Sequence, residues 1–117
     1  MSFNNGPTIV TNGLILALDA GDKNSYVSGS TTWFDLTGVN NGTLTNGPTF
    51  NSGSGGSIVF DGVDDYVVVP NSVAPTSAVT MIFWINETFT NYYLSVLSRN
   101  NNTLTGSPTG VGYGTPI

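Results

Sequence analysis

The sequence contains no cysteine and no histidine, and Lys23 and Arg99 are its only basic residues. Without cysteine the chain can form neither disulfides nor thiolate metal sites, and without histidine it lacks the usual ligand of transition metals and the base of catalytic triads. Two isolated cations cannot displace the counterions of a nucleic-acid backbone or bind an anionic membrane surface. The composition therefore argues against nucleic acid and membrane as partners.

Residues that favour helices are also scarce. Ala, Glu, Lys, Gln, Arg and Met together make up 9 of the 117 residues, whereas Gly, Ser, Thr and Asn make up 57. The first group loses least entropy in a helix, and the second builds turns and connections between strands. Apolar residues still reach 38% and cluster in short runs, which argues against disorder. The composition predicts an all-β protein.

No apolar stretch is long enough to cross a bilayer, and residues 1–7 have neither a basic region nor an apolar core of the kind that a secretory signal needs. We expect no signal peptide. Gly6-Pro7 interrupts regular structure, so residues 1–12 are predicted to form an irregular arm. Residues 13–117 are predicted to form a single β-sandwich domain.

Short apolar runs between turn residues give the expected strands. Residues 13–19 are apolar on both faces, which predicts a strand covered on both sides. Residues 57–61 and 66–69 are predicted to form a hairpin, with residues 62–65 as its turn. The other expected strands are residues 43–45, 49–50, 79–86 and 92–98. Residues 33–36 form a short apolar island. Residues 51–56 are predicted to be a flexible connection, and residues 100–117 an irregular tail.

Residues 79–86 form the most hydrophobic of these runs. On a strand, Val79, Met81, Phe83 and Ile85 would face the core, and Ile82 and Trp84 would face the other side. A solvent face does not usually carry two such side chains. We therefore expect that a loop or a partner chain covers this second face, and that Trp84 lies in the core or in an interface.

Five segments follow one another in an order that resembles a known family. They are residues 13–21 (GLILALDAG), 32–38 (TWFDLTG), 41–50 (NGTLTNGPTF), 56–67 (GSIVFDGVDDYV) and 79–85 (VTMIFWI). Together they resemble the concanavalin A-like lectin/glucanase (laminin-G-like) domains in virion structural proteins of tailed phages. The resemblance implies an antiparallel jelly-roll sandwich on a particle surface, fibre or capsid decoration. Domains of this kind also bind glycans or proteins, sometimes through calcium.

The resemblance ends near residue 86, and family domains are usually longer. The chain is therefore a shortened variant, a fragment of a longer polypeptide, or a sandwich that neighbouring subunits complete. Unpaired strand edges need to be covered. We expect the chain to associate with copies of itself and with other virion proteins.

The acidic residues do not form the pattern that a glucanase on this fold needs, which is a pair of carboxylates across the scissile bond. Glu87 is the only glutamate, and the adjacent Asp64 and Asp65 would point to opposite faces of a strand. We predict no catalytic residues and no enzyme activity. A degenerate glucanase is the least favoured of the functions considered.

Calcium is the more serious metal candidate for these acids, because it binds six to eight oxygen ligands and needs neither nitrogen nor sulfur. Asp61, Asp64 and Asp65 crowd one turn, and Asp19 and Asp22 crowd another. Carboxylates in turns commonly accept hydrogen bonds from nearby backbone amides, so turn formation is favoured over metal binding and no cofactor is predicted. The candidates for ligand binding are Asp64, Asp65 and Tyr66.

Two functions follow from these observations. The first is a phage virion structural or decoration protein that packs on the particle or projects from it. The alternative is a carbohydrate-binding adhesin that recognises a host surface glycan.

Overall fold

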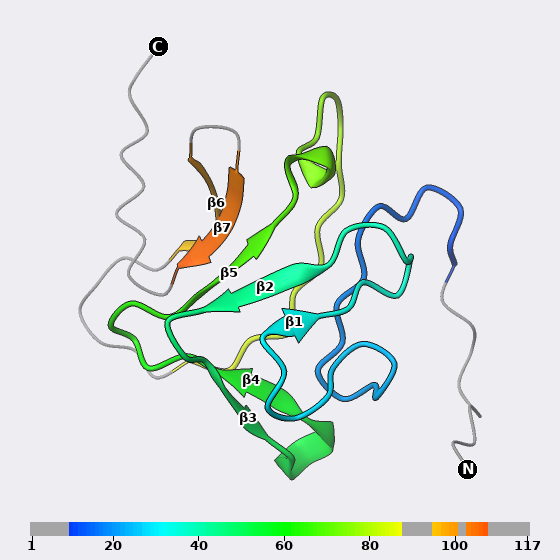
Figure 1. Cartoon of the computed structure of the whole chain (residues 1–117). Coiled ribbons are helices and arrows are strands. Elements are labelled where there is room, and N and C mark those ends of the chain that lie inside the picture. The colour runs from blue at the N-terminus through cyan, green and yellow to red at the C-terminus, as the bar shows by residue number, and fades with distance from the viewer. Residues whose placement is uncertain (1–9, 88–94, 101–102, 108–117) are drawn as a thin grey trace.

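The computed structural model describes residues 10–87, 95–100 and 103–107, which form two antiparallel sheets (Figure 1). The larger sheet has the order β1-β2-β5-β7-β6, and the smaller one pairs β3 with β4. Two 3-10 turns, η1 and η2, are the only helical elements of the described residues. The bounds are β1 Thr32–Trp33, β2 Gly42–Thr45, β3 Thr49–Asn51, η1 Gly53–Gly55, β4 Ser57–Val59, β5 Tyr66–Val69, η2 Asn71–Val73, β6 Ser95–Asn100 and β7 Thr103–Ser107. The prediction of an all-β protein is confirmed.

The core lies on one face of the larger sheet. Leu44 on β2 pairs with Val67 on β5, and both are buried, as is Val69 two residues further on. Side chains alternate between the two faces of a strand, so these three share one face. Tyr26 covers them from a loop, and Phe50 and Ile58 of the smaller sheet pack against the same cluster.

The smaller sheet is a tight hairpin whose loop contains η1. Ser54, Gly55 and Gly56 all have positive φ, which turns the chain back within a few residues. The backbone of this loop lies against residues 20 and 21. A Cβ on Gly56 would lie 2.9 Å from both the carbonyl oxygen of Ala20 and the Cα of Gly21. Of residues 51–56, predicted to be a flexible connection, Asn51 ends β3 and residues 52–56 form the loop of this hairpin.

The predicted hairpin of residues 57–61 and 66–69 is wrong. β4 pairs with β3, while β5 pairs with β2 and β7, so the two segments belong to different sheets. Residues 62–64 form a bend that carries the chain from one sheet to the other. Short strands at 43–45 and 49–50 are confirmed as β2 and β3, each with slightly wider bounds.

Residues 13–19 do not form the predicted strand. Their backbone instead bonds to the loops on either side of β1. The amide of Ala17 donates to Asp35, and the carbonyl of Ala17 accepts from the amide of Leu36. Because these bonds come from a loop, no strand ladder forms, and Ile15 stays 45% exposed.

Residues 79–86 do not form the predicted strand either. Val79, Met81, Phe83 and Ile85, expected in the core, are 45–65% exposed, and Trp84 is 98% exposed. Among the described residues, no backbone hydrogen bond of a turn, loop or cap involves this segment. Without a paired neighbour the apolar pattern alone does not produce a strand.

The C-terminal part contains one strand, β7, that the sequence did not predict. β6 overlaps the predicted strand 92–98, but β7 lies within the predicted irregular tail. It occupies a central position between β5 and β6, so the tail prediction is wrong for residues 103–107. Residues 92–94 and 108–117, and most of the predicted arm, lie outside the described residues.

Candidate functional site

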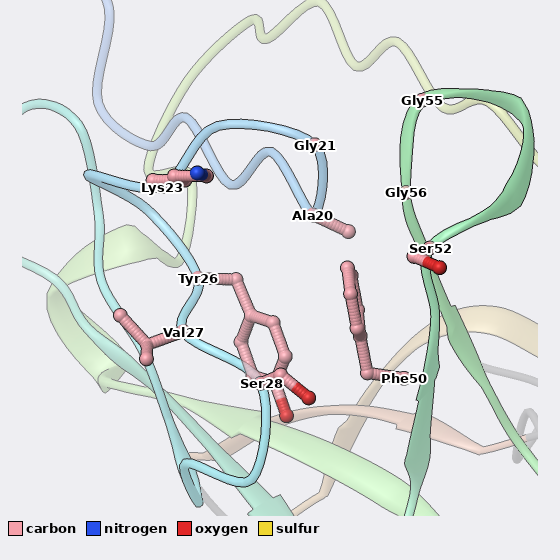
Figure 2. A pocket seen from close by; sticks show the side chains of 10 residues that line it. All are labelled: Ala20, Gly21, Lys23, Tyr26, Val27, Ser28, Phe50, Ser52, Gly55 and Gly56. Carbon is pink, nitrogen blue, oxygen red and sulfur yellow. The ribbon is translucent and has the colours of Figure 1, made fainter. Parts of the chain in front are cut away.

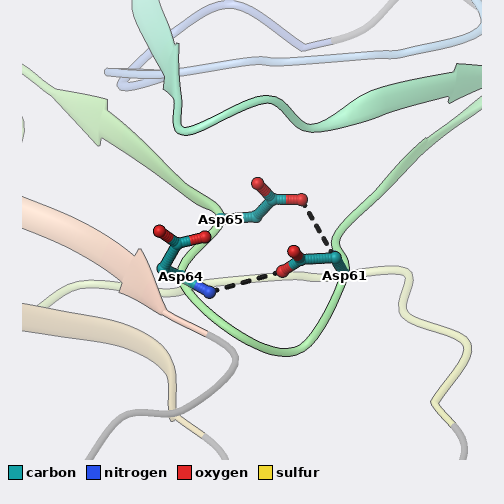
Figure 3. Close-up of side chains that lie close together, drawn as sticks. All are labelled: Asp61, Asp64 and Asp65. Atoms are coloured by element: carbon teal, nitrogen blue, oxygen red, sulfur yellow. Dashed lines mark hydrogen bonds between the residues drawn. The ribbon is translucent and has the colours of Figure 1, made fainter.

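Three aspartates come together on the bend between β4 and β5 (Figure 3). Asp61, Asp64 and Asp65 each offer a carboxylate oxygen, and these oxygens lie within 4.8 Å of one another. Asp61 and Asp64 are exposed, and Asp65 is 3% exposed. Gly62, at φ 77°, lets the bend close.

Backbone amides bind two of these carboxylates. Asp61 Oδ1 accepts hydrogen bonds from the amides of Val63 at 2.8 Å and Asp64 at 3.3 Å, and Asp65 Oδ2 accepts from the amide of Asp61 at 2.9 Å. The bond from Val63 is the largest cause that holds the pKa of Asp61 below its ordinary value. These bonds are those of turn-forming aspartates.

The structure brings together two of the three predicted ligand-binding residues. Asp64 and Asp65 were expected to diverge, as neighbours on a strand do. Their carboxylates converge because residues 62–64 form a bend. Tyr66 begins β5 and is half-buried, on the strand face opposite to Asp65 and Val67. Tyr66 is therefore not part of the acidic cluster.

The second predicted acidic turn has the same character. Asp19 Oδ1 accepts from the amide of Gly21 at 2.8 Å, and Asp22 Oδ1 accepts from the amide and side chain of Asn24. Each carboxylate thus accepts hydrogen bonds from a residue of its own turn.

Calcium is expected to leave the stability of the protein unchanged, because backbone amides already bind a carboxylate oxygen of Asp61 and one of Asp65. The measurement is the midpoint of thermal unfolding in calcium and in a chelator. A ligand that binds the folded state raises that midpoint by mass action. A calcium-dependent rise that is lost in Asp64→Asn would show that the turn is a metal site.

Two open hollows flank the pair formed by Tyr26 and Phe50, whose ring centroids are 5.3 Å apart. The first hollow, of about 350 Å³, lies between residues 20–28 and the β3–β4 loop, and Figure 2 shows Phe50 pointing into it. The second, of about 410 Å³, lies on the side of residues 28–31 and 46–49. Among the described residues, Lys23 is the only charged one in either wall, so neither hollow holds a pair of carboxylates.

A buried polar cluster ties the N-terminal segment to the rest of the fold, and sequence reasoning missed it. The Asp35 carboxylate, 4% exposed, accepts hydrogen bonds from the amides of Ala17, Thr37 and Asn40 and from the Thr37 hydroxyl. The side chain of Asn40 bonds in turn to the carbonyl of Ile15 and the hydroxyl of Ser72. The sequence signal was an aspartate two residues before a threonine in TWFDLTG, the pattern of a side chain that organises its own turn.

Burial is the largest influence on Asp35 and taken alone raises its pKa. The hydrogen bonds from Thr37, Ala17 and Asn40 outweigh it together, and the pKa of Asp35 is held below its ordinary value. The carboxylate is therefore charged in the folded protein at neutral pH. Asp35 lines neither of the two hollows, and its hydrogen bonds hold the loop.

Of the two tryptophans, Trp33 is half-buried against Tyr26, with its Nε1 buried and without an acceptor. The core position considered for Trp84 is wrong, and its place in an interface stays a prediction.

Comparison of the chain with protein-family models, with curated proteins and with solved structures found no match. The family resemblance of the five segments therefore stays a prediction. In the part of the chain that the structure describes, no helix is long and apolar enough to cross a membrane.

Proposed function

We propose that this chain is a structural module of a phage particle, a β-sandwich of the jelly-roll kind that packs against neighbouring subunits and has no catalytic role. The observation that carries the proposal is the imbalance between its core and its surface. Four apolar residues are buried among the described residues, whereas fourteen large apolar side chains are exposed. Six of these fourteen lie in residues 79–85.

Such an imbalance is typical of a chain that buries its apolar surface in an assembly. Scattered apolar side chains are ordinary on a protein surface, but a continuous run marks a contact with another protein or with a membrane. A formal charge of −5 with only two basic residues disfavours an anionic membrane as the partner. Neighbouring protein chains are the partner that fits this surface.

A catalytic role has no support in the arrangement of the acids. The Asp61, Asp64 and Asp65 carboxylates share a turn rather than facing each other across a hollow, and both hollows lack an acid in their walls. Hydrolysis of a glycosidic bond needs two carboxylates about 5–10 Å apart on either side of the substrate.

The proposal predicts that the polypeptide is part of purified particles. We expect mass spectrometry to find it in particles that have been washed with detergent and treated with protease, at a stoichiometry that repeats between preparations. The control is a host protein of similar size from the same lysate, which the treatment should remove. Loss of the polypeptide together with that control would overturn the proposal.

A carbohydrate-binding adhesin is the second candidate, and the hollow at Phe50 is the observation that favours it. An aromatic wall with serine hydroxyls at its edge, from Ser28 and Ser52, suits a sugar ring and its hydroxyl groups. The test is binding to a glycan array with and without calcium. Signal that Phe50→Ala removes would support this function, and absence of signal in both conditions would eliminate it.

A further inference from the structure

Residues 78–86 contain the longest run of exposed large apolar side chains in the described part of the chain. Ile82 is 81% exposed and Trp84 98% exposed, and Val79, Met81, Phe83 and Ile85 are each exposed by 45% or more. The segment contains no charged residue, no glycine and no proline. It belongs to no strand and runs behind the larger sheet (Figure 1).

The backbone of this segment is available for pairing. Within the described part of the chain, neither the backbone bonds of turns and loops nor the side-chain hydrogen bonds involve residues 78–87. Val, Thr, Ile, Phe and Trp are the residues that strands prefer. A segment with strand-forming residues and free amides and carbonyls can add to another strand through main-chain hydrogen bonds.

The segment is complementary to itself in an antiparallel arrangement centred on Ile82. That register places Val79 opposite Ile85 and Met81 opposite Phe83 on one face. On the other face Thr80 lies opposite Trp84, and Ile82 meets the Ile82 of the second copy. Each of these pairs therefore joins two apolar side chains or an aromatic and a β-branched one, and pairs of this kind stabilise cross-strand contacts.

Charge does not oppose this pairing. Like charges directly opposite each other destabilise a strand pair, but all seven acids and both bases lie outside residues 78–86. Glu87, the first charge after the segment, would lie opposite Ser77. A twofold pair of this kind closes on itself, as most homodimers do.

The segment exposes an apolar area comparable in order of magnitude to one side of a standard interface. An aromatic side chain offers about 150–250 Å², and Trp84 is nearly fully exposed while Phe83 is half exposed. With the four exposed aliphatic residues added, each copy presents several hundred Å², the same order as the roughly 800 Å² per partner of a standard interface.

We propose that residues 78–86 are a homotypic docking strand, which pairs antiparallel with the same residues of a second copy of this chain. This inference rests on the proposed assembly function and names the partner. It can fail while that function stands, because particle incorporation through a different protein would leave the isolated chain monomeric.

The test is the mass of the full-length chain in solution, measured by sedimentation over a range of concentrations for the natural sequence, Ile82→Lys and Ile82→Glu. Each charge variant places like charges opposite each other at the twofold axis, so we expect its dimer to dissociate about 30-fold more readily or worse, the loss typical of a central interface residue. An equimolar mixture of the two variants places lysine opposite glutamate and should form the dimer again.

The matched control is Val39→Lys, which adds the same charge at a residue that is 75% exposed in a loop. It should dimerise like the natural sequence. A monomeric natural sequence at all concentrations would overturn the proposal, and so would a dimer that Ile82→Lys and Val39→Lys affect equally. Failure of the mixed variants to recombine would overturn the register and the homotypic pairing with it.

Discussion

Replacement of Asp35 with alanine is expected to lower the free energy of unfolding by about 3–5 kcal/mol, a large part of the roughly 5–15 kcal/mol that stabilises a typical domain. The substitution removes a buried acceptor and leaves the amides of Ala17, Thr37 and Asn40 without a partner. A buried donor that loses its bond, such as the Asn40 amide, costs about 1–3 kcal/mol, and the part-buried amides of Ala17 and Thr37 cost less. The measurement is equilibrium denaturation in urea.

The matched control is Asp19→Ala. Asp19 also accepts a hydrogen bond from a backbone amide, that of Gly21, but its side chain is exposed and water can replace it. Asp19→Ala should therefore lower the free energy of unfolding by less than about 1 kcal/mol. Equal losses for the two variants would mean that the buried network does not hold the loop.

Asp35 also makes a specific contribution to the pH dependence of stability. Its pKa in the folded protein is lower than in the unfolded chain, so its stabilising effect is fully present above the unfolded value, 3.8, and is lost as the pH falls through the folded value. Asp35→Asn keeps the shape but cannot ionise. The variant should lose less stability than the natural sequence as the pH is lowered below 4.

Local features of the fold could be predicted from the sequence, and pairing could not. β2, β3 and β5 were found because short apolar runs between turn residues identify strands whatever their partners. The partner of β4 was missed, because residues 57–61 and 66–69 have the spacing of a hairpin. The bond from the Asp61 amide to Asp65 belongs to a bend that carries the chain between sheets, and only the folded structure reveals it.

The two most apolar runs also show that strand pairing could not be predicted from the sequence. Residues 13–19 and 79–86 have strand-like composition, yet a strand forms only where a second one offers its amides and carbonyls. The first run bonds to a loop instead, and the second has no partner among the described residues. Whether a run becomes a strand thus depends on chain that is distant in sequence or belongs to another molecule.

For the candidate site, the crowding of the aspartates was predictable because the residues are close in sequence. The buried cluster was not, since Asp35 and Asn40 draw together residues 15, 17 and 72, which are far apart along the chain. A polar residue in a sequence gives no indication of its burial. Its neighbours in space decide whether it is a surface turn former or a structural centre.

Replacement of Gly56 with alanine is expected to cost about 3–5 kcal/mol, from two separate causes. Gly56 has φ 108°, which side-chain-bearing residues rarely adopt, at a cost of about 1–3 kcal/mol. Its new Cβ would also lie 2.9 Å from the backbone of Ala20 and Gly21, and such crowding typically costs another 1–3 kcal/mol. The loop could avoid this only by moving away from residues 20 and 21.

Two neighbouring glycines separate these causes. Gly55→Ala adds a Cβ with no atom within 4 Å, at φ 92°, and therefore reports backbone strain alone, about 1–2 kcal/mol. Gly21→Ala has no positive φ and would overlap the carbonyl oxygen of Gly55, and therefore reports the close approach alone. Denaturation in urea should rank Gly56→Ala as more damaging than Gly55→Ala. If these two cost the same, the loop of residues 53–56 does not lie against residues 20 and 21, and the first hollow at Phe50 loses that wall.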